Sequence, residues 1–251
     1  MSRALTMLFA LVAYAIFFAT FIYLIAFVGN VAGVVPRTVD VGPAAPVATA
    51  AVIDIALIAL FGLQHSVMAR QGFKKWWTRV VPEPAERSVY VLMASAMLII
   101  LMSFWRPIDG TVWSVTNPIG EAILWGLFAL GWGIVLISTF LLNHFELFGL
   151  QQAWFHMRGR QAEPPTLRQP MFYKWVAHPL YSGFFLAFWA TPHMSYGHLL
   201  LAAGVSLYML IAIRYEERDL TSYYGEDYTR YRSGVGMLFP RFGKEPATPA
   251  K

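Results

Sequence analysis

Two clusters of polar residues near the C-terminal end of the chain have the residue types of a catalytic or binding site. The first, H-P-L-Y-S-G, runs from His178 to Gly183, and the second, R-Y-E-E-R-D, runs from Arg214 to Asp219. The apolar residues 184–213 lie between them. If this stretch forms a hairpin in a membrane, both clusters return to the same side of the bilayer and can meet. Ionisable side chains at membrane edges are costly, so the sequence predicts a functional site here.

Tyrosines follow the second cluster at intervals typical of one face of a helix. Tyr228 and Tyr231 fall near the face that carries Glu217. Tyr224 joins them if the helix is interrupted at Gly225, where glycine suits a left-handed helix end. Carboxylates suit ribose hydroxyls and amino groups, and aromatic rings stack on adenine and attract a sulfonium cation. The same pattern is typical of an amphipathic helix at a membrane surface, so the residues alone leave both interpretations open.

Two histidines mark the ends of apolar segments elsewhere in the chain. Gln64-His65-Ser66 lies near the end of one segment, and Asn143-His144 follows another. A buried histidine bonded to a neighbouring helix, or a cation that caps a helix C-terminus, would explain them without any chemistry. If these segments span a membrane, however, both histidines lie at the side that carries the C-terminal clusters. They are therefore candidate site residues.

The composition predicts an all-α integral membrane protein. Of the 251 residues, 57% are hydrophobic and 13% are charged, whereas a soluble domain usually carries about 25% charged residues. A spanning helix needs roughly 20 apolar residues, with about 17 as the lower limit. Four segments meet this requirement and two are marginal, so we predict a bundle of five to six transmembrane helices that ends in a helical hairpin. The six segments are residues 5–28, 48–69, 88–105, 120–142, 179–194 and 196–213.

The distribution of basic residues predicts the orientation in the membrane. Loops 70–87 and 143–178 and the C-terminal tail are rich in Lys and Arg, whereas loops 29–47 and 106–119 each contain only one. Alternating sides then place both termini in the cytoplasm, which requires an even number of crossings. The net charge of +5 follows from this topology, so nucleic-acid binding is a poor explanation for it. Cysteine is absent, which excludes disulfides, thiolate metal sites and a cysteine nucleophile.

The C-terminal motifs resemble those of the membrane methyltransferases related to isoprenylcysteine carboxyl methyltransferase and bacterial phospholipid N-methyltransferases. Their signature is roughly R-H-P-x-Y-x-G, an apolar hairpin, then E-E-x-x-L, F-G-x-x-Y-x-x-Y and V-x-x-x-x-P. The chain departs from it at Ala177, where arginine is usual, and at Tyr224, where phenylalanine is common. The matching residues are His178, Pro179, Tyr181, Gly183, Glu216, Glu217, Leu220, Gly225, Tyr228, Tyr231, Val235 and Pro240.

Three more stretches, residues 21–30, 63–78 and 143–150, are similar to the methanethiol S-methyltransferase branch of this superfamily. Members of that branch make dimethyl sulfide from methanethiol and S-adenosylmethionine. The resemblance implies a bacterial inner-membrane enzyme that uses a small thiol as substrate, S-adenosyl-L-methionine as cofactor and no metal. It also implies one domain over residues 1–251, with a four-helix scaffold in 1–142 and a cytoplasmic, helical cofactor-binding and catalytic part in 143–251.

The resemblance and the polar clusters together imply roles for individual residues. The expected proton acceptors are His144, His65 and Glu217, in that order. The candidate substrate contacts are Asn143, Arg87 and Arg214. The expected cofactor-binding residues are His178, Pro179, Leu180, Tyr181, Glu216, Glu217, Leu220, Tyr224, Tyr228 and Tyr231.

Other functions remain open at the level of sequence. A related methyltransferase could act on an isoprenylcysteine carboxylate or a phospholipid amine, substrates that need a lateral opening to the lipid. A non-enzymatic haem or redox membrane protein could use His65, His144 and His178 as ligands, although all three lie near one side of the predicted membrane rather than within it. A transporter is the weakest alternative, because no inverted repeat is evident.

Overall fold

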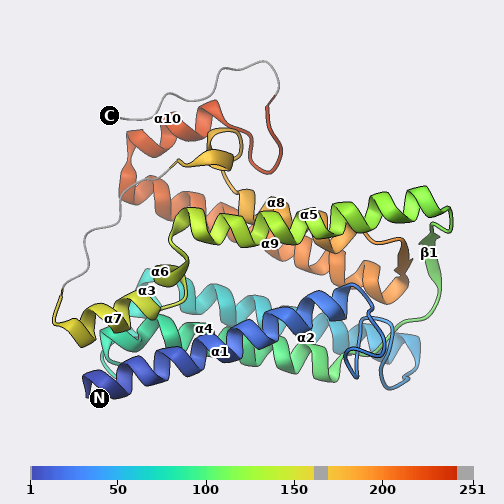
Figure 1. Cartoon of the computed structure of the whole chain (residues 1–251), viewed down its shortest axis with the longest axis horizontal. Helices are drawn as coiled ribbons and strands as arrows, with labels where there is room; N and C mark the ends of the chain where they lie inside the picture. The colour runs from blue at the N-terminus through green and yellow to red at the C-terminus, as the bar shows by residue number, and fades with distance from the viewer. Residues whose placement is uncertain (1, 161–168, 242–251) are drawn as a thin grey trace. The chain divides into compact units, whose positions relative to one another are not determined.

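The computed structural model describes residues 2–160 and 169–241. It confirms an all-α integral membrane protein, because five helices in the described part of the chain are long and apolar enough to cross a bilayer. They match five of the six predicted segments to within a few residues at most ends (Figure 1). These helices are α1 (Arg3–Val28), α2 (Val47–Ala69), α4 (Glu83–Phe104), α5 (Pro118–Leu142) and α9 (Tyr196–Tyr224).

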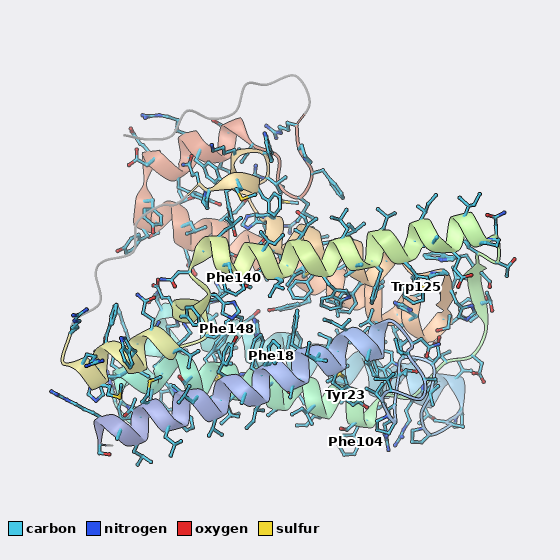
Figure 2. All side chains as sticks on the ribbon, in the orientation of Figure 1. Phe18, Tyr23, Phe104, Trp125, Phe140 and Phe148 are labelled. Carbon is cyan, nitrogen blue, oxygen red and sulfur yellow. The ribbon has the colours of Figure 1, made fainter. Side chains whose placement is uncertain are left out.

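The surfaces of the long helices carry apolar side chains that suit contact with lipid. In the most apolar part of α1, only 28% of the residues are buried inside the protein. Large side chains such as Phe18 on α1 and Phe104 at the end of α4 are about half exposed, and Trp125 and Phe140 on α5 are also exposed (Figure 2). Exposed aromatic residues on this scale are unusual on soluble proteins, and a surrounding bilayer accounts for them.

The chain divides into two compact units. Unit 1 contains Met1–Val115, His144–Glu163 and Pro192–Val205, and unit 2 contains Thr116–Asn143, Pro164–Thr191 and Ser206–Lys251. Each unit is therefore built from segments that are far apart in the sequence. The functional division at residue 142 that the sequence suggests stays a prediction.

In unit 1, α1 packs against α4 and against α7 (Leu150–Arg158), and α4 also packs against α2 (Figure 1). Fully buried side chains such as Phe27 and Leu101 fill this bundle. Two short helices complete the unit, α3 (Gln71–Trp77) and α6 (His144–Leu147). Part of the predicted basic loop 70–87 is thus helical.

A network of hydrogen bonds closes one end of unit 1. The strands β1 (Thr111–Ser114) and β2 (His193–Ser195) pair there in antiparallel fashion, a feature that the sequence does not predict. Asp40 accepts hydrogen bonds from the Asn30 amide (3.0 Å) and from the Ser195 hydroxyl (2.5 Å). The Thr38 hydroxyl donates to the Asn30 side-chain oxygen. We call Asn30, Thr38, Asp40 and Ser195 the Asp40 network.

Unit 2 is held together by close packing of α5 against α8 (Pro179–Trp189). The two helices run antiparallel, since Gly131 contacts Ala187 and Val135 contacts Gly183. A Cβ atom at Gly183 would lie 2.7 Å from the carbonyl oxygen of Gly131, so only glycine allows this approach without a shift of the backbone.

The predicted hairpin differs from the structure at both of its helices. The predicted segment 179–194 contains α8, which has only 11 residues and is too short to span a bilayer by itself. The predicted segment 196–213 is too short, because α9 has 29 residues and continues to Tyr224. Charged residues with good helix propensity extend it beyond the apolar region. The predicted break at Gly225 is present, with φ +61°, and α10 (Glu226–Gly234) follows it.

Candidate functional site

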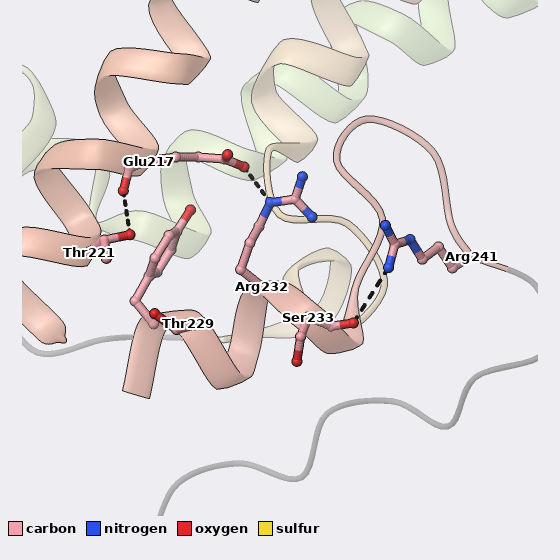
Figure 3. A pocket seen from close by; sticks show the side chains of 7 residues that line it. Glu217, Thr221, Thr229, Arg232, Ser233 and Arg241 are labelled. Carbon is pink, nitrogen blue, oxygen red and sulfur yellow. Dashed lines mark hydrogen bonds and ion pairs between the residues drawn. The ribbon is translucent and has the colours of Figure 1, made fainter. Parts of the chain in front are cut away.

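An open pocket in unit 2 lies between the end of α9 and α10. Its volume is about 400 Å³, which falls in the range of ligand pockets, ~300–1,000 Å³. Figure 3 shows side chains that line it, with the acidic Glu217 facing the guanidinium of Arg232. The lining residues are Glu217, Thr221, Tyr228, Thr229, Arg232, Ser233 and Arg241.

Glu217 is the centre of the charged groups in this pocket. Its Oε1 atom accepts a hydrogen bond from Nε of Arg232 and another, 3.2 Å long, from Nε2 of His178. Within residues 2–160 and 169–241, the second carboxylate oxygen, Oε2, has no hydrogen-bond partner. The carboxylate is thus fixed in position by two donors and keeps an oxygen that can accept from a ligand.

Backbone pairing between the two ends of the C-terminal motif positions His178. The Ala177 amide donates to the Gly236 carbonyl (2.8 Å), and the His178 amide donates to the Met237 carbonyl (3.2 Å). The Ser182 hydroxyl, on the first turn of α8, also donates to the Leu238 carbonyl at 2.7 Å. The segment after α10 therefore folds back onto the start of α8, which places the imidazole beside Glu217.

Two buried tyrosines on α10 differ in how their hydroxyls are satisfied. The Tyr231 hydroxyl donates to the carbonyl oxygen of Tyr173 at 2.8 Å. The Tyr228 hydroxyl is equally buried but has no hydrogen-bond partner in the part of the chain that the structure describes. Burial raises the pKa of both phenols above the ordinary value of 10, so both are protonated at pH 7. Tyr228 therefore offers an unused donor in the wall of the pocket.

Of the predicted cofactor-binding residues, Glu217 and Tyr228 line this pocket, and the others do not. Leu220 and Tyr224 pack against a buried cluster formed by Tyr228, Tyr231, Val235 and Ala177, the position where the family signature usually has arginine. The His178 Nδ1 atom lies 4.0 Å from Oε1 of Glu216. Pro179, Leu180 and Tyr181 form the first turn of α8, and the Tyr181 ring centroid is 5.7 Å from that of His178.

Two predicted substrate residues of unit 2 do not line the pocket. Arg214 is exposed on α9, about one turn before Glu217. Asn143 ends α5 with a left-handed backbone, φ +107°. Their proposed contacts with substrate stay predictions.

The predicted histidines of unit 1 each pair with a tyrosine. Nε2 of His144, on α6, lies 2.8 Å from the Tyr14 hydroxyl on α1. Nε2 of His65, on α2, lies 2.8 Å from the Tyr90 hydroxyl on α4. The Arg87 guanidinium lies over the Tyr90 ring, 5.9 Å from its centroid. Burial lowers the pKa of His144 below its ordinary value of 6.5, so this imidazole is neutral at pH 7.

Four residues that line the pocket were not predicted from the sequence, although a usable signal existed for most of them, and Thr221 was predicted only as an alternative to Leu220 on the same helix face. Thr229, Arg232 and Ser233 recur at helical spacing on α10, next to Tyr228, which is the pattern of one polar helix face. Thr221 lies one turn after Glu217 on α9. Arg241 follows the last motif residue, and only the fold brings it to the pocket.

Comparisons with known proteins give a consistent result. The chain is 50% identical over 240 residues to a methanethiol S-methyltransferase of Mycobacterium tuberculosis, covering 96% of this chain and 98% of that protein. It is 45% identical over 245 residues to a methanethiol S-methyltransferase of Crocosphaera subtropica, covering 98% and 95%. Nurim of Xenopus laevis is 30% identical over 205 residues, covering 78% and 68%. No family model and no solved structure matches the chain.

Proposed function

This chain belongs to the methanethiol S-methyltransferase family, and we propose that it transfers a methyl group from S-adenosylmethionine to methanethiol and releases dimethyl sulfide. A methyl donor is required by the class of enzyme, and a sulfonium supplies a methyl group that a sulfur nucleophile can displace. The residues of the chain bind and align the two reactants, keep water away and accept the thiol proton.

The pocket of unit 2 is the proposed site of the methyl donor, and the unpaired, buried Tyr228 hydroxyl is the observation that carries this proposal. Buried polar groups are normally satisfied, so an unpaired one in a pocket wall indicates a missing partner. Oε2 of Glu217 provides an acceptor in the same pocket. Ribose hydroxyls can both accept from Tyr228 and donate to Glu217, which fits a nucleoside ligand.

The basic side of the pocket suits the amino-acid end of S-adenosylmethionine. Arg232 and Arg241 both line the pocket, and guanidinium groups bind carboxylates strongly and with defined geometry. Arg232 is already bonded to Glu217, and Arg241 approaches the Ser233 carbonyl oxygen at 3.5 Å. We therefore propose that Arg241 binds the carboxylate of S-adenosylmethionine and that Arg232 holds Glu217 in position.

His144 is the proposed acceptor of the thiol proton. The thiolate rather than the thiol is the nucleophile, so an unprotonated base has to take the proton. Burial keeps the His144 imidazole neutral at pH 7 by lowering its pKa. His65 is the second candidate because it has the same kind of tyrosine partner. Glu217 is the third, and its contacts with Arg232 and His178 favour a binding role instead.

The proposed orientation keeps both termini on the cytoplasmic side of a bacterial inner membrane. Five spanning helices alone would separate the termini, so one further pass is needed. The antiparallel helix α8 and the extended residues that lead to β2 supply this pass, since β2 pairs with β1 at the end of unit 1 that precedes α5. The basic loops 70–87 and 143–178 then face the cytoplasm.

Headspace detection of dimethyl sulfide tests the proposal. Purified protein in detergent is supplied with methanethiol and S-adenosylmethionine, with the donor omitted as a control. We expect the sulfide to form only with both reactants, and calorimetry to detect binding of the donor. Binding of the donor without sulfide would move the proposal to a lipid substrate. Absence of both binding and sulfide would overturn it.

A further inference from the structure

A short basic helix connects two of the spanning helices of unit 1. The helix α3 begins two residues after the end of α2 and packs against it, and α4 begins at Glu83. Because α2 and α4 cross the bilayer, residues 70–87 lie at one of its surfaces. They include five basic and two acidic residues, which gives a net charge of +3 at a surface that anionic lipids make negative.

Aromatic side chains give this helix the character of a membrane interface. Phe73, Trp76 and Trp77 pack together, with ring centroids 5.5 to 5.8 Å apart. Trp76 is 54% exposed, and Val80, just after the helix, is 75% exposed. Tryptophan is enriched at the level of the lipid headgroups, so headgroups are the surroundings that suit this surface.

Two cations lie close together on the less exposed side of this helix. Lys74 on α3 and Arg87 near the start of α4 are both half-buried, and the Arg87 guanidinium covers the Tyr90 ring. Burial lowers the pKa of Lys74 below its ordinary value of 10.5, and the charge of Arg87 lowers it further, while Glu86 acts in the opposite direction. Among the residues that the structure describes, neither cation forms an ion pair. An anion bound to both would offset their repulsion.

Trp77 adds a hydrogen-bond donor beside Lys74. Its indole nitrogen is buried and has no partner in the described part of the chain. Trp77 follows Lys74 by three residues, so the two side chains share one face of α3. Buried N–H groups are normally paired, so this one indicates an acceptor that a ligand supplies. Two cations and an indole N–H are all donors, and phosphate is an anion that such groups bind.

We propose that Lys74, Trp77 and Arg87 bind the phosphate of an anionic phospholipid of the surrounding bilayer. The occupant is a lipid rather than a free anion because the site lies at the bilayer surface, next to the exposed Trp76 and Val80. A zwitterionic choline lipid is disfavoured, since it would bring a third cation to the two already present. The inference does not depend on methyl transfer, and it gives Arg87 a partner other than the thiol that the sequence suggests.

Native mass spectrometry of the detergent-purified protein tests this site, with phosphatidylglycerol and phosphatidylcholine of the same acyl chains as probes. We expect phosphatidylglycerol to bind about tenfold more tightly, since one charged hydrogen bond contributes at least this much. Lys74→Gln should remove most of this preference. Lys75→Gln is the matched control, because it loses the same charge from the neighbouring, exposed position. We expect it to change the affinity less than about twofold, since an exposed charge is screened.

A second pair of variants leaves the charge of the helix unchanged. Trp77→Phe removes the buried N–H and keeps an aromatic ring, so we expect phosphatidylglycerol to bind about fivefold more weakly. Trp76→Phe makes the same change at the exposed position and should bind the lipid like the native protein. Thermal unfolding checks that each variant is folded.

The controls also define the results that would overturn the proposal. Equal losses in Lys74→Gln and Lys75→Gln would mean that general surface charge attracts the lipid and that this site does not exist. Equal binding of the two lipids by the native protein would overturn it as well. Inorganic phosphate is the last probe: if it displaces phosphatidylglycerol at equal concentration, the site binds a free anion and a lipid is not its occupant.

Discussion

The Asp40 network of unit 1 and the pocket of unit 2 are both dense polar clusters around one carboxylate, but they differ in how their groups are satisfied. Both oxygens of Asp40 accept hydrogen bonds, one from Ser195 and one from Asn30. The Ser195 hydroxyl also accepts from the His198 amide at 2.9 Å. In the pocket, by contrast, only one oxygen of Glu217 is used, and the Tyr228 hydroxyl lacks a partner among the described residues.

This difference separates a structural cluster from a binding site. The cavity beside Asp40 is also smaller, about 190 Å³ against about 400 Å³ for the pocket of unit 2. A carboxylate with both oxygens paired stabilises the loop and strand that supply its donors. A carboxylate with a free oxygen beside an unpaired donor gains its remaining bonds from a ligand. Substitutions should therefore change stability in the first cluster and binding in the second.

Glu217→Gln should have the largest effect on activity. The amide cannot keep charge-assisted bonds to both Arg232 and His178, and it presents a weaker acceptor to the ligand. We expect binding of S-adenosylmethionine to weaken about 100-fold, since one charged hydrogen bond contributes roughly 1.5–3 kcal/mol. Calorimetry measures the affinity, and thermal unfolding checks that the fold is kept. Full affinity in a folded variant would remove Glu217 from the site.

Asp40→Asn makes the same carboxylate-to-amide change in the satisfied cluster. Its NH₂ group would face either the Asn30 amide, which is a donor, or the Ser195 hydroxyl, which would have to turn and accept, and both hydrogen bonds lose the charge of the carboxylate. We expect a loss of about 1–3 kcal/mol in the free energy of unfolding. The affinity for S-adenosylmethionine of the folded fraction should not change. A weaker affinity at unchanged stability would mean that the Asp40 network is more than structural.

A pair of tyrosine variants sharpens the comparison within one helix. Tyr228→Phe removes a hydroxyl that the fold leaves unpaired, so we expect binding to weaken about tenfold with little loss of stability. Tyr231→Phe removes the bond to the Tyr173 carbonyl, so we expect about 1 kcal/mol less stability and near-native affinity. Calorimetry measures the affinity of both variants for S-adenosylmethionine, and thermal unfolding measures their stability. Weaker binding in Tyr231→Phe together with lower stability in Tyr228→Phe would refute the proposal that Tyr228 binds the ligand.

Physical reasons explain how far the sequence predicts the fold. Hydropathy locates the five long helices because the bilayer fixes their length and apolar character. It does not reveal that α8 has only 11 residues, because an apolar run contains both the helix and the extended residues after it. The strand pair β1–β2 escapes prediction for a similar reason. Each strand has only three or four residues, and its partner is remote in the sequence.

The candidate site is predictable where spacing along one helix defines it. Glu217 and Tyr228 are found from helical spacing and from the resemblance to the family, and the same spacing also indicates Arg232. Arg241 cannot be found in this way, because its position depends on the return of residues 235–238 to the start of α8. Nor does the sequence reveal that Tyr14 is the partner of His144, since only tertiary packing joins them.

The smallest expected effect is on the stability of the fold at alkaline pH, and it again distinguishes Tyr228 from Tyr231. Burial raises the pKa of Tyr228 above 10, the value that a tyrosine has in the unfolded chain. The unfolded chain therefore loses this proton near pH 10 while the folded chain keeps it, so the stability that Tyr228 contributes is present below pH 10 and is lost as the pH rises further. Tyr228→Phe should accordingly unfold at a slightly higher pH than the native protein, measured by circular dichroism. Tyr231→Phe should unfold at about the same alkaline pH as the native protein, because the hydrogen bond that it loses offsets the same gain in alkaline stability. A lower alkaline midpoint for Tyr228→Phe would indicate that its hydroxyl is already paired within the fold.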